Sequence, residues 1–280
     1  MSQDTIKIKK RIKSVTGAYK VTSAMKLVST VKLKKWKNKM MANNLYNNEL
    51  QEVVNLLLMC SKNINSPFSK VNNSNKRLFI IVSSTLGLCG SYNINIFKEA
   101  DVLLKKEDSV IILGKKGIAH FSNEMFDKIE GFDDNKDLLE KDLINNLSKY
   151  VLSSYVEGKY SSIHIIYSKY RNSLTFIPTS YQILPLGNND NIQDLDFPPL
   201  FEPSKEKLIE TLVPIYVEGT IYSKLLESEV SEQASRSNAM ENATNNAKEL
   251  LDNLKIEFNK ARQTAITQEI IEIVAAAKAV

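Results

Sequence analysis

The stretch AMENATNNAKELLDNLKIEFNKARQTA, residues Ala239–Ala265, decides the fold. Small or apolar side chains recur in it every three or four positions: Ala239, Ala243, Ala247, Leu250, Leu254, Phe258, Ala261 and Ala265. This spacing places them on one stripe of an α-helix, and the alanines allow a second helix to approach closely. The stretch therefore predicts a helix that pairs with another helix.

Both ends of the chain are predicted to be very long helices. The segment Lys205–Val280 contains one proline, Pro214, and one glycine, Gly219, and the segment from Asp4 to about Cys60 contains no proline. At a rise of about 1.5 Å per residue, either helix would run roughly 80–100 Å, several times the width of a small domain. Helices of this length cannot be enclosed in one core, so we expect them to pair and to project from it.

The N-terminal arm carries a stripe of its own. Apolar or small residues occupy Ile8, Ile12, Val15, Ala18, Val21, Met25, Val28 and Val31, always three or four positions apart. Two such stripes facing each other make a coiled coil. Because a folded segment connects the two arms, the coiled coil is expected to be antiparallel.

Charge distinguishes the two arms. Before Met40, Lys and Arg occupy twelve positions and Asp4 is the only acidic residue, whereas the C-terminal arm carries more acidic than basic residues. Opposite charges favour pairing, although an exposed pair contributes only about 0.2–1 kcal/mol. The surplus positive charge is either a solvated helix face or the contact for an acidic partner, namely nucleic acid, a membrane surface or acidic protein loops. The apolar tip Ile270–Ala277 predicts an interface, unless it is buried in an ordinary bundle.

The middle of the chain alternates between strand and helix patterns. Continuous apolar runs predict buried strands at 77–83, 109–114 and 163–167, an edge strand at 175–184, and helices near 94–105 and 136–156. This alternation predicts an α/β fold in which a small Rossmann-like domain with a parallel or mixed sheet is inserted between the arms. The expected domains are an N-terminal coiled-coil arm (1–62), the α/β domain (76–200) and a C-terminal coiled-coil arm (205–280).

Catalytic, cofactor and metal sites are not expected. The motif Gly87–Gly90 follows the first strand, but it is not G-x-G-x-x-G and it lacks the Lys and Ser/Thr of a P-loop, so a tight turn is the preferred interpretation. His120 and His164 are not at metal-ligand spacing, and Cys89 has no neighbouring base in the sequence. Two cysteines fit a reducing compartment, and no run of about 18 apolar residues predicts a membrane span.

Segments near both ends resemble the γ subunit of F-type ATP synthases, and the similarity spans nearly the full length. The segments that carry it are Ile8–Val15, Lys20–Val28, Gly87–Gly90, Phe201–Pro203, Ser231–Ala234, Asn242–Ala247 and Asn259–Ile270.

The resemblance implies a central rotor shaft without catalytic residues of its own. The coiled coil would turn inside a hexamer of α and β subunits, and the α/β domain would form a foot near the ε subunit and the membrane c-ring. Rotation would couple ATP synthesis or hydrolysis on β to proton translocation. The protein would be peripheral, on the cytoplasmic side of the cell membrane.

The resemblance also assigns individual contacts. Contacts with β fall on the two arms: Met25, Lys26, Arg262, Gln263, Thr267, Gln268 and Glu269. Phe201 and Glu202 would belong to the surface of the foot that faces the ring and ε.

One departure leaves an alternative open. Thr85 and Leu86 stand where the family usually has Asp-Arg, which removes two charges from the foot. This favours a second hypothesis, a γ-like shaft of an F-like ATPase that drives a load other than a proton ring. A third hypothesis, a coiled-coil adaptor that binds nucleic acid through the basic arm, lacks aromatic residues interleaved with the lysines. An enzyme in the middle domain is the fourth.

Overall fold

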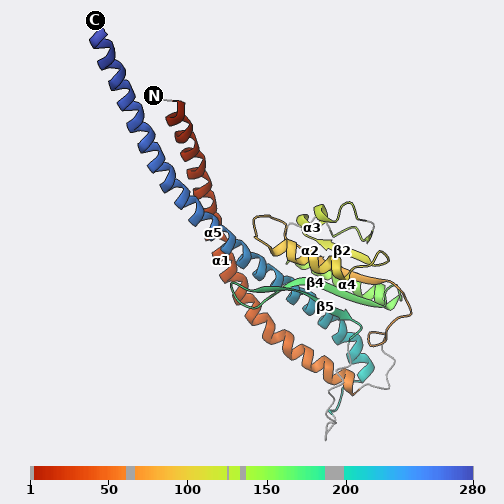
Figure 1. The fold of residues 1–280 in the computed structure, drawn as a ribbon. Helices are drawn as coiled ribbons and strands as arrows, with labels where there is room; N and C mark the ends of the chain where they lie inside the picture. The colour runs from red at the N-terminus through yellow and green to blue at the C-terminus, as the bar shows by residue number, and fades with distance from the viewer. Residues whose placement is uncertain (1–2, 61–66, 125, 133–136, 187–198, 280) are drawn as a thin grey trace. The chain divides into compact units, whose positions relative to one another are not determined.

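The computed structural model describes residues 3–60, 67–124, 126–132, 137–186 and 199–279 (Figure 1). Its elements are, in order, α1 (Gln3–Met59), β1 (Arg77–Val82), α2 (Tyr92–Leu103), β2 (Ser109–Leu113), α3 (Lys115–His120), β3 (Asp127–Lys128), α4 (Lys141–Val156), β4 (Ser162–Tyr170), β5 (Phe176–Leu184) and α5 (Lys205–Ala279). The chain divides into two compact units, which we call the helix-pair unit (residues 1–31 and 236–280) and the sheet unit (residues 32–235).

The sheet has five strands in the order β3-β2-β1-β4-β5. β1 pairs in parallel with β2 and β4, with Ile80 opposite Ile111 on one side and Ile165 on the other. β5 pairs antiparallel with β4 at the edge, which confirms the predicted mixed sheet. β3 was not predicted, because two residues are too short to show an apolar period.

Both faces of the central strands are buried, which explains their continuous apolar runs. One face packs with α4 and with parts of α1 and α5, in a core that includes Leu147, Leu57 and Val217. The other face packs with α2 and α3, where Ile96 and Phe121 are fully buried. The inserted α/β fold predicted from the alternating pattern is confirmed.

A buried salt bridge fixes one end of β1. The Arg77 guanidinium lies 2.6 Å (Nη2 to Oδ2) and 3.0 Å (Nε to Oδ1) from the Asp108 carboxylate. Asp108 is buried and also accepts the backbone N–H of Lys105 at 2.8 Å. Removing Arg77 would leave a buried charge without its partner, which typically costs on the order of 3 kcal/mol.

Both long helices are present as predicted. α1 has 57 residues and α5 has 75, and α5 contains Pro214 without ending there. At about 1.5 Å per residue, α5 is roughly 110 Å long. In the part of the chain that the structure describes, no helix is both long enough and apolar enough to cross a membrane.

The predicted stripe on α1 is wrong beyond its first turns. Ile8, Ile12 and Val15 are half-buried, but Val21 is 59% exposed and Val28 56% exposed. The more buried side of this part of α1 keeps Met25 from the predicted stripe but otherwise carries mostly polar side chains: Tyr19, Thr22, Ser23, Lys26 and Ser29. Apolar residues at spacings of three or four are compatible with two neighbouring stripes. The contacts with α5 use the polar one, through Thr22, Lys26 and Thr30.

Candidate functional site

Three contacts fix how α1 and α5 pair in the helix-pair unit. Thr244 Oγ1 donates to Thr22 Oγ1 at 3.0 Å, and Thr30 and Ser237 exchange a hydroxyl hydrogen bond at 3.1 Å. Between them the Lys26 ammonium donates to the Glu241 carboxylate at 2.7 Å. Residue numbers rise along α1 as they fall along α5, so the helices run antiparallel, as expected.

This register sets the end of the paired region. Extended along two regular helices, it places Thr5 opposite Ala261; Thr5 is buried and Ala261 half-buried, as a continuing pair requires. α5 therefore runs on past the first residues of α1. Among the described side chains, all of 266–277 are exposed.

The exposed end of α5 combines apolar and polar side chains. Its apolar members are each about half exposed or more: Ile266, Ile270, Ile271, Ile273 and Val274. An exposed apolar surface of this kind typically marks an interface, and the interface that the sequence predicts here stays a prediction.

Of the predicted contact residues on α5, Thr267, Gln268 and Glu269 lie on this exposed end, and Arg262 and Gln263 lie just before it, where the pairing with α1 ends. Arg262, Gln263, Thr267, Gln268 and Glu269 are exposed. Thr267 Oγ1 donates to the Gln263 carbonyl at 2.9 Å, and Gln268 Nε2 donates to the Glu272 carboxylate at 3.1 Å; both bonds are internal to the helix. The contacts assigned to these residues stay predictions.

Met25 and Lys26 are not next to these residues. They lie opposite the region of α5 around Glu241, about 30 Å along the helix from Arg262. Met25 is half-buried in the helix pair, and Lys26 is engaged with Glu241. The structure thus divides the predicted β contacts between two levels of the helix pair.

Phe201 and Glu202 precede α5 in the sheet unit. Phe201 is half-buried and packs against the main core, and the Lys205 ammonium lies 5.5 Å from its ring centroid. Lys205 also donates to the Cys60 carbonyl at 2.7 Å, just beyond the end of α1. Glu202 is exposed, whereas Phe201 serves partly as a packing residue.

Within the sheet unit, α5 crosses the carboxyl ends of β1 and β4. Ser228 shares a 2.7 Å hydroxyl hydrogen bond with Tyr92 at the start of α2. Ser231 Oγ donates to the Ser168 carbonyl of β4 at 2.8 Å. We call Ser228, Ser231 and Ser235 the serine seam.

The third member of the seam reaches the glycine-rich turn. Ser235 Oγ donates at 2.6 Å to the carbonyl of Cys89. Phosphate and nucleotide sites of open α/β folds lie at the carboxyl ends of the strands. Here α5 packs against the glycine-rich turn at this edge of the sheet.

A charged pair continues the contact between α5 and the sheet. Lys224 Nζ lies 4.0 Å from a Glu227 oxygen and within 5.3 Å and 4.6 Å of the Tyr167 and Tyr181 ring centroids. Burial lowers the pKa of Lys224 and raises the pKa of Glu227, although their mutual attraction opposes both shifts. Tyr170 donates its backbone N–H to Glu227 at 3.2 Å.

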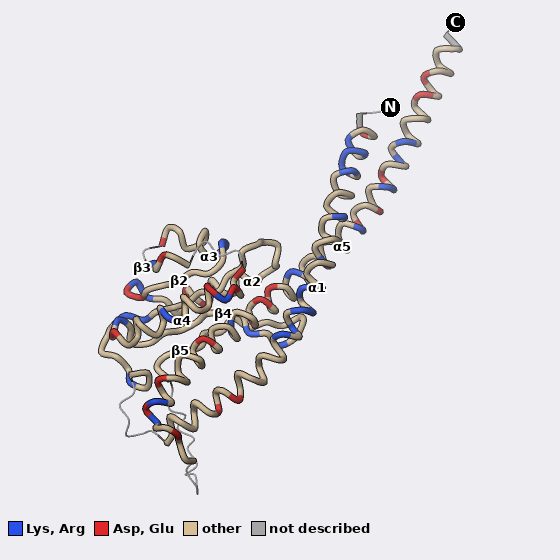
Figure 2. Tube along the Cα trace, turned by 180° about the vertical axis from the view of Figure 1, so that it is seen from behind, with Lys and Arg blue, Asp and Glu red and all other residues tan. Residues whose placement is uncertain are grey.

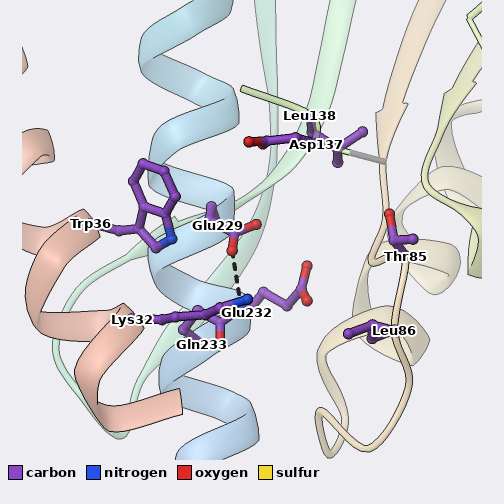
Figure 3. A pocket seen from close by; sticks show the side chains of 9 residues that line it. All are labelled: Lys32, Trp36, Thr85, Leu86, Asp137, Leu138, Glu229, Glu232 and Gln233. Carbon is purple, nitrogen blue, oxygen red and sulfur yellow. Dashed lines mark hydrogen bonds between the residues drawn. The ribbon is translucent and has the colours of Figure 1, made fainter. Parts of the chain in front are cut away.

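A cavity of about 380 Å³ lies beside the glycine-rich turn (Figure 3). Its walls come from α1, α5, the turn after β1 and the segment before α4: Lys32, Trp36, Thr85, Leu86, Asp137, Leu138, Glu229, Glu232 and Gln233. Gln233 Nε2 donates to the Glu229 carboxylate at 2.9 Å across one turn of α5. The departure from the family pattern thus falls at a cavity wall, where Leu86 is 62% exposed.

The histidines and Cys89 serve packing in this structure. His164 stacks on Phe79 with 5.1 Å between ring centroids, and His120 stacks on Phe97 at 4.1 Å. Cys89 is buried and accepts a hydrogen bond from Asn93 Nδ2 at 3.3 Å.

One group of side chains has the chemistry of a metal site. Atoms of Asp101, His120 and Glu124 that could act as ligands lie within 4.8 Å of one another, and all three residues are exposed. Exposed carboxylates are commonly solvated without a metal, so these residues alone do not define a site.

These features define a class of protein, the stalk proteins in which two long antiparallel helices carry an inserted α/β domain. The chain matches the family model described as ATP synthase over residues 4–280. It is 40% identical to the ATP synthase gamma chain of Mycoplasma mobile, with 96% of each chain covered, and 36% identical to that of Clostridium kluyveri, with 98% and 97% covered. The chain belongs to the ATP synthase gamma chain family.

Solved structures share the fold. A chain from the central stalk and c-ring structure of the Tetrahymena thermophila mitochondrial ATP synthase is 24% identical, with a TM-score of 0.60 over 80% of this chain and 99% of that chain. A chain of the Euglena gracilis mitochondrial ATP synthase rotor is 17% identical, with a TM-score of 0.62 over 93% and 99%. Family membership makes this chain a non-catalytic stalk subunit that belongs to the peripheral part of the enzyme.

Proposed function

We propose that this chain is the central shaft of a rotary F-type ATPase, with its helix pair turning inside a hexamer of α and β subunits. The exposed end of α5 is the observation that carries this proposal. The end of α5 exposes a row of isoleucine and valine side chains beyond the paired region, and such an apolar surface calls for a partner that covers it. A sleeve of α and β subunits would supply one, and rotation favours many weak contacts over a few strong ones.

The contacts with β fall at two levels in this proposal. Arg262, Gln263, Thr267, Gln268 and Glu269 would meet loops of β around the exposed end of α5. Met25 and Lys26 would meet β about 30 Å from there along the axis of the helix pair, toward the sheet unit. The basic residues of α1, visible as the blue segments in Figure 2, suit acidic loops on the same subunits.

The sheet unit is the proposed foot. Its exposed surface near Glu202 would face the ε subunit and the c-ring, and the chain would lie on the cytoplasmic side of the cell membrane. Rotation of the ring, driven by protons, would then turn the shaft and change the three β subunits in sequence.

The glycine-rich turn favours the alternative in which the shaft drives a partner other than a proton ring. Leu86 and Leu88 are each 62% exposed there, and no charged residue lies between Ser83 and Ser91. A partner that recognises the charged Asp-Arg pair usual in the family would not find it here. An apolar turn instead suits a partner with an apolar surface. The alternative function is therefore the shaft of an F-like ATPase that drives another machine.

A purification tests both functions. A tag on the sheet unit, mild detergent and mass spectrometry would identify the proteins that accompany the chain. Recovery of α, β, ε and a small apolar ring protein supports the ion-coupled enzyme. Recovery of α- and β-like subunits with other proteins and no ring supports the alternative. Recovery of no ATPase subunit would contradict both.

A further inference from the structure

The serine seam is an unusual way to attach a helix to a sheet. Ser228, Ser231 and Ser235 lie on one face of α5, and each is 5% exposed or less. A buried hydroxyl stabilises a fold only when its hydrogen bonds are made, because losing water otherwise costs about 1–3 kcal/mol. Here the three hydroxyls together bond to three elements: Ser228 to α2 and β4, Ser231 to β4, and Ser235 to the turn after β1.

The neighbouring part of α5 attaches differently. Between Ile209 and Leu225 the helix buries apolar side chains against the core, among them Val213, Val217 and Ile221. Apolar contacts hold surfaces together without strong directional preference. Hydrogen bonds weaken steeply when their angle or length changes. The apolar segment therefore stabilises the packing of α5 on the core. The seam fixes the rotational orientation of α5 about its own axis.

We infer that the serine seam is the joint that transmits torque between the sheet domain and the shaft. The inference rests on the proposed function. Torque applied to the sheet domain tends to rotate α5 against β4 and the glycine-rich turn. The bonds to three separate elements resist that rotation, and α5 continues as one helix to Ala279.

The position of the seam supports this role. Ser235 is the last residue of the sheet unit on α5, and Arg236 is the first α5 residue of the helix-pair unit. The seam thus occupies the last two turns of α5 within the sheet unit. Beyond it, α5 continues as the same helix into the helix-pair unit.

The test measures the angular fluctuation of the sheet domain in the assembled complex. The α/β hexamer is fixed to a surface, a bead is attached to the sheet domain, and thermal rotation is recorded without ATP. In Ser228→Ala/Ser231→Ala the angular variance should rise roughly twofold or more, because the hydroxyl bonds that tie α5 to Tyr92 and to Ser168 are lost. Ser231→Thr, which keeps a hydroxyl, should stay nearer to the original variance.

Two controls separate torque transmission from general stability. Ser223→Ala removes another buried hydroxyl of α5 for which the described contacts include no bond to the sheet, and it should leave the variance unchanged. Arg77→Ala lowers the stability of the sheet domain away from the seam, and it should also leave the variance unchanged. An equal rise in either control would overturn the inference.

The remaining outcomes are also decisive. If the double variant does not fold, Ser231→Ala is measured in its place, with hydrogen exchange of residues 225–235 as a second readout that should quicken. An unchanged variance in a complex that assembles normally would overturn the role of the seam as a joint and would leave the proposed function standing. If the unaltered chain assembles with no hexamer, the proposed function fails, and the joint has no torque to transmit.

Discussion

Lys26 Nζ donates a hydrogen bond of 2.7 Å to Glu241 Oε1 across the pair formed by α1 and α5. The resemblance assigns Lys26 to a contact with β, and in this chain the Lys26 ammonium also has a partner on α5. Both side chains are more than a third exposed, so the pair specifies the register of the helices more than it stabilises them.

The first prediction concerns that pair. Lys26→Ala should lower the free energy of unfolding of the chain by no more than about 1 kcal/mol, because water screens an exposed pair. A double-mutant cycle with Glu241→Ala, measured by urea denaturation at low and high salt, gives the coupling. We expect a small coupling that salt reduces. A coupling above roughly 2 kcal/mol, insensitive to salt, would mean that the pair is buried in solution.

The second prediction concerns the exposed end of α5. Ile270→Asp/Ile271→Asp should change the unfolding free energy by less than about 0.5 kcal/mol per site, because both side chains are more than half exposed. The same change should reduce the recovery of α and β subunits with the tagged chain. Val102→Asp, at an exposed apolar position of α2, is the matched control and should leave recovery unchanged. Full recovery with the double variant would show that the tip is not an interface.

The third prediction concerns the turn from β2 to α3. Gly114 has φ +90°, and a Cβ there would lie 2.1 Å from the Ser83 carbonyl oxygen. Gly114→Ala should therefore lower stability by more than about 3 kcal/mol. Gly158 also has a positive φ, +74°, but no atom lies within 4 Å of its added Cβ. Gly158→Ala should cost only about 1–2 kcal/mol, and equal losses in urea denaturation would rule out the clash as the cause.

The fourth prediction is a loss of stability in acid. Burial, and then the nearby Arg77 guanidinium, lower the pKa of His164 from 6.5, although Asp108 opposes them. Above pH 6.5 the imidazole is neutral in both folded and unfolded chains. Below it the unfolded chain binds the proton first, so stability should fall until the lower folded pKa is passed.

A matched pair of variants tests this acid response. His164→Phe keeps an aromatic ring against Phe79 and should reduce the loss of stability below pH 6.5. His120→Asn should retain that loss. Denaturation midpoints measured from pH 7.5 down to pH 5 would compare them. The same acid loss in His164→Phe as in the unaltered chain would assign it to other groups.

The sequence predicted the larger elements well because their patterns are long. Absence of helix breakers over most of α1 and α5, and unbroken apolar runs such as Leu78–Val82, each have one simple structural interpretation. The phase of the α1 stripe was wrong because apolar spacing alone cannot choose between neighbouring faces. Ser29 is buried and Thr22 half-buried there although both are polar, which a pattern of apolar residues does not predict.

The serine seam was beyond sequence reasoning for a related reason. Serines in a helix are usually exposed, and only the path of α5 across β4 shows why Ser231 is buried. The available signal was the spacing of Ser228, Ser231 and Ser235, which places three hydroxyls on one face. The contacts assigned to Arg262 and its neighbours depend on partner subunits and stay predictions.

The most direct test of the central claim is rotation. The complex purified through this chain would be fixed by its catalytic hexamer, with a bead on the sheet domain, and observed after addition of ATP. The account predicts rotation in one direction that requires ATP and stops when it is removed. A bead that shows only thermal motion, on a complex that hydrolyses ATP at its normal rate, would contradict the account.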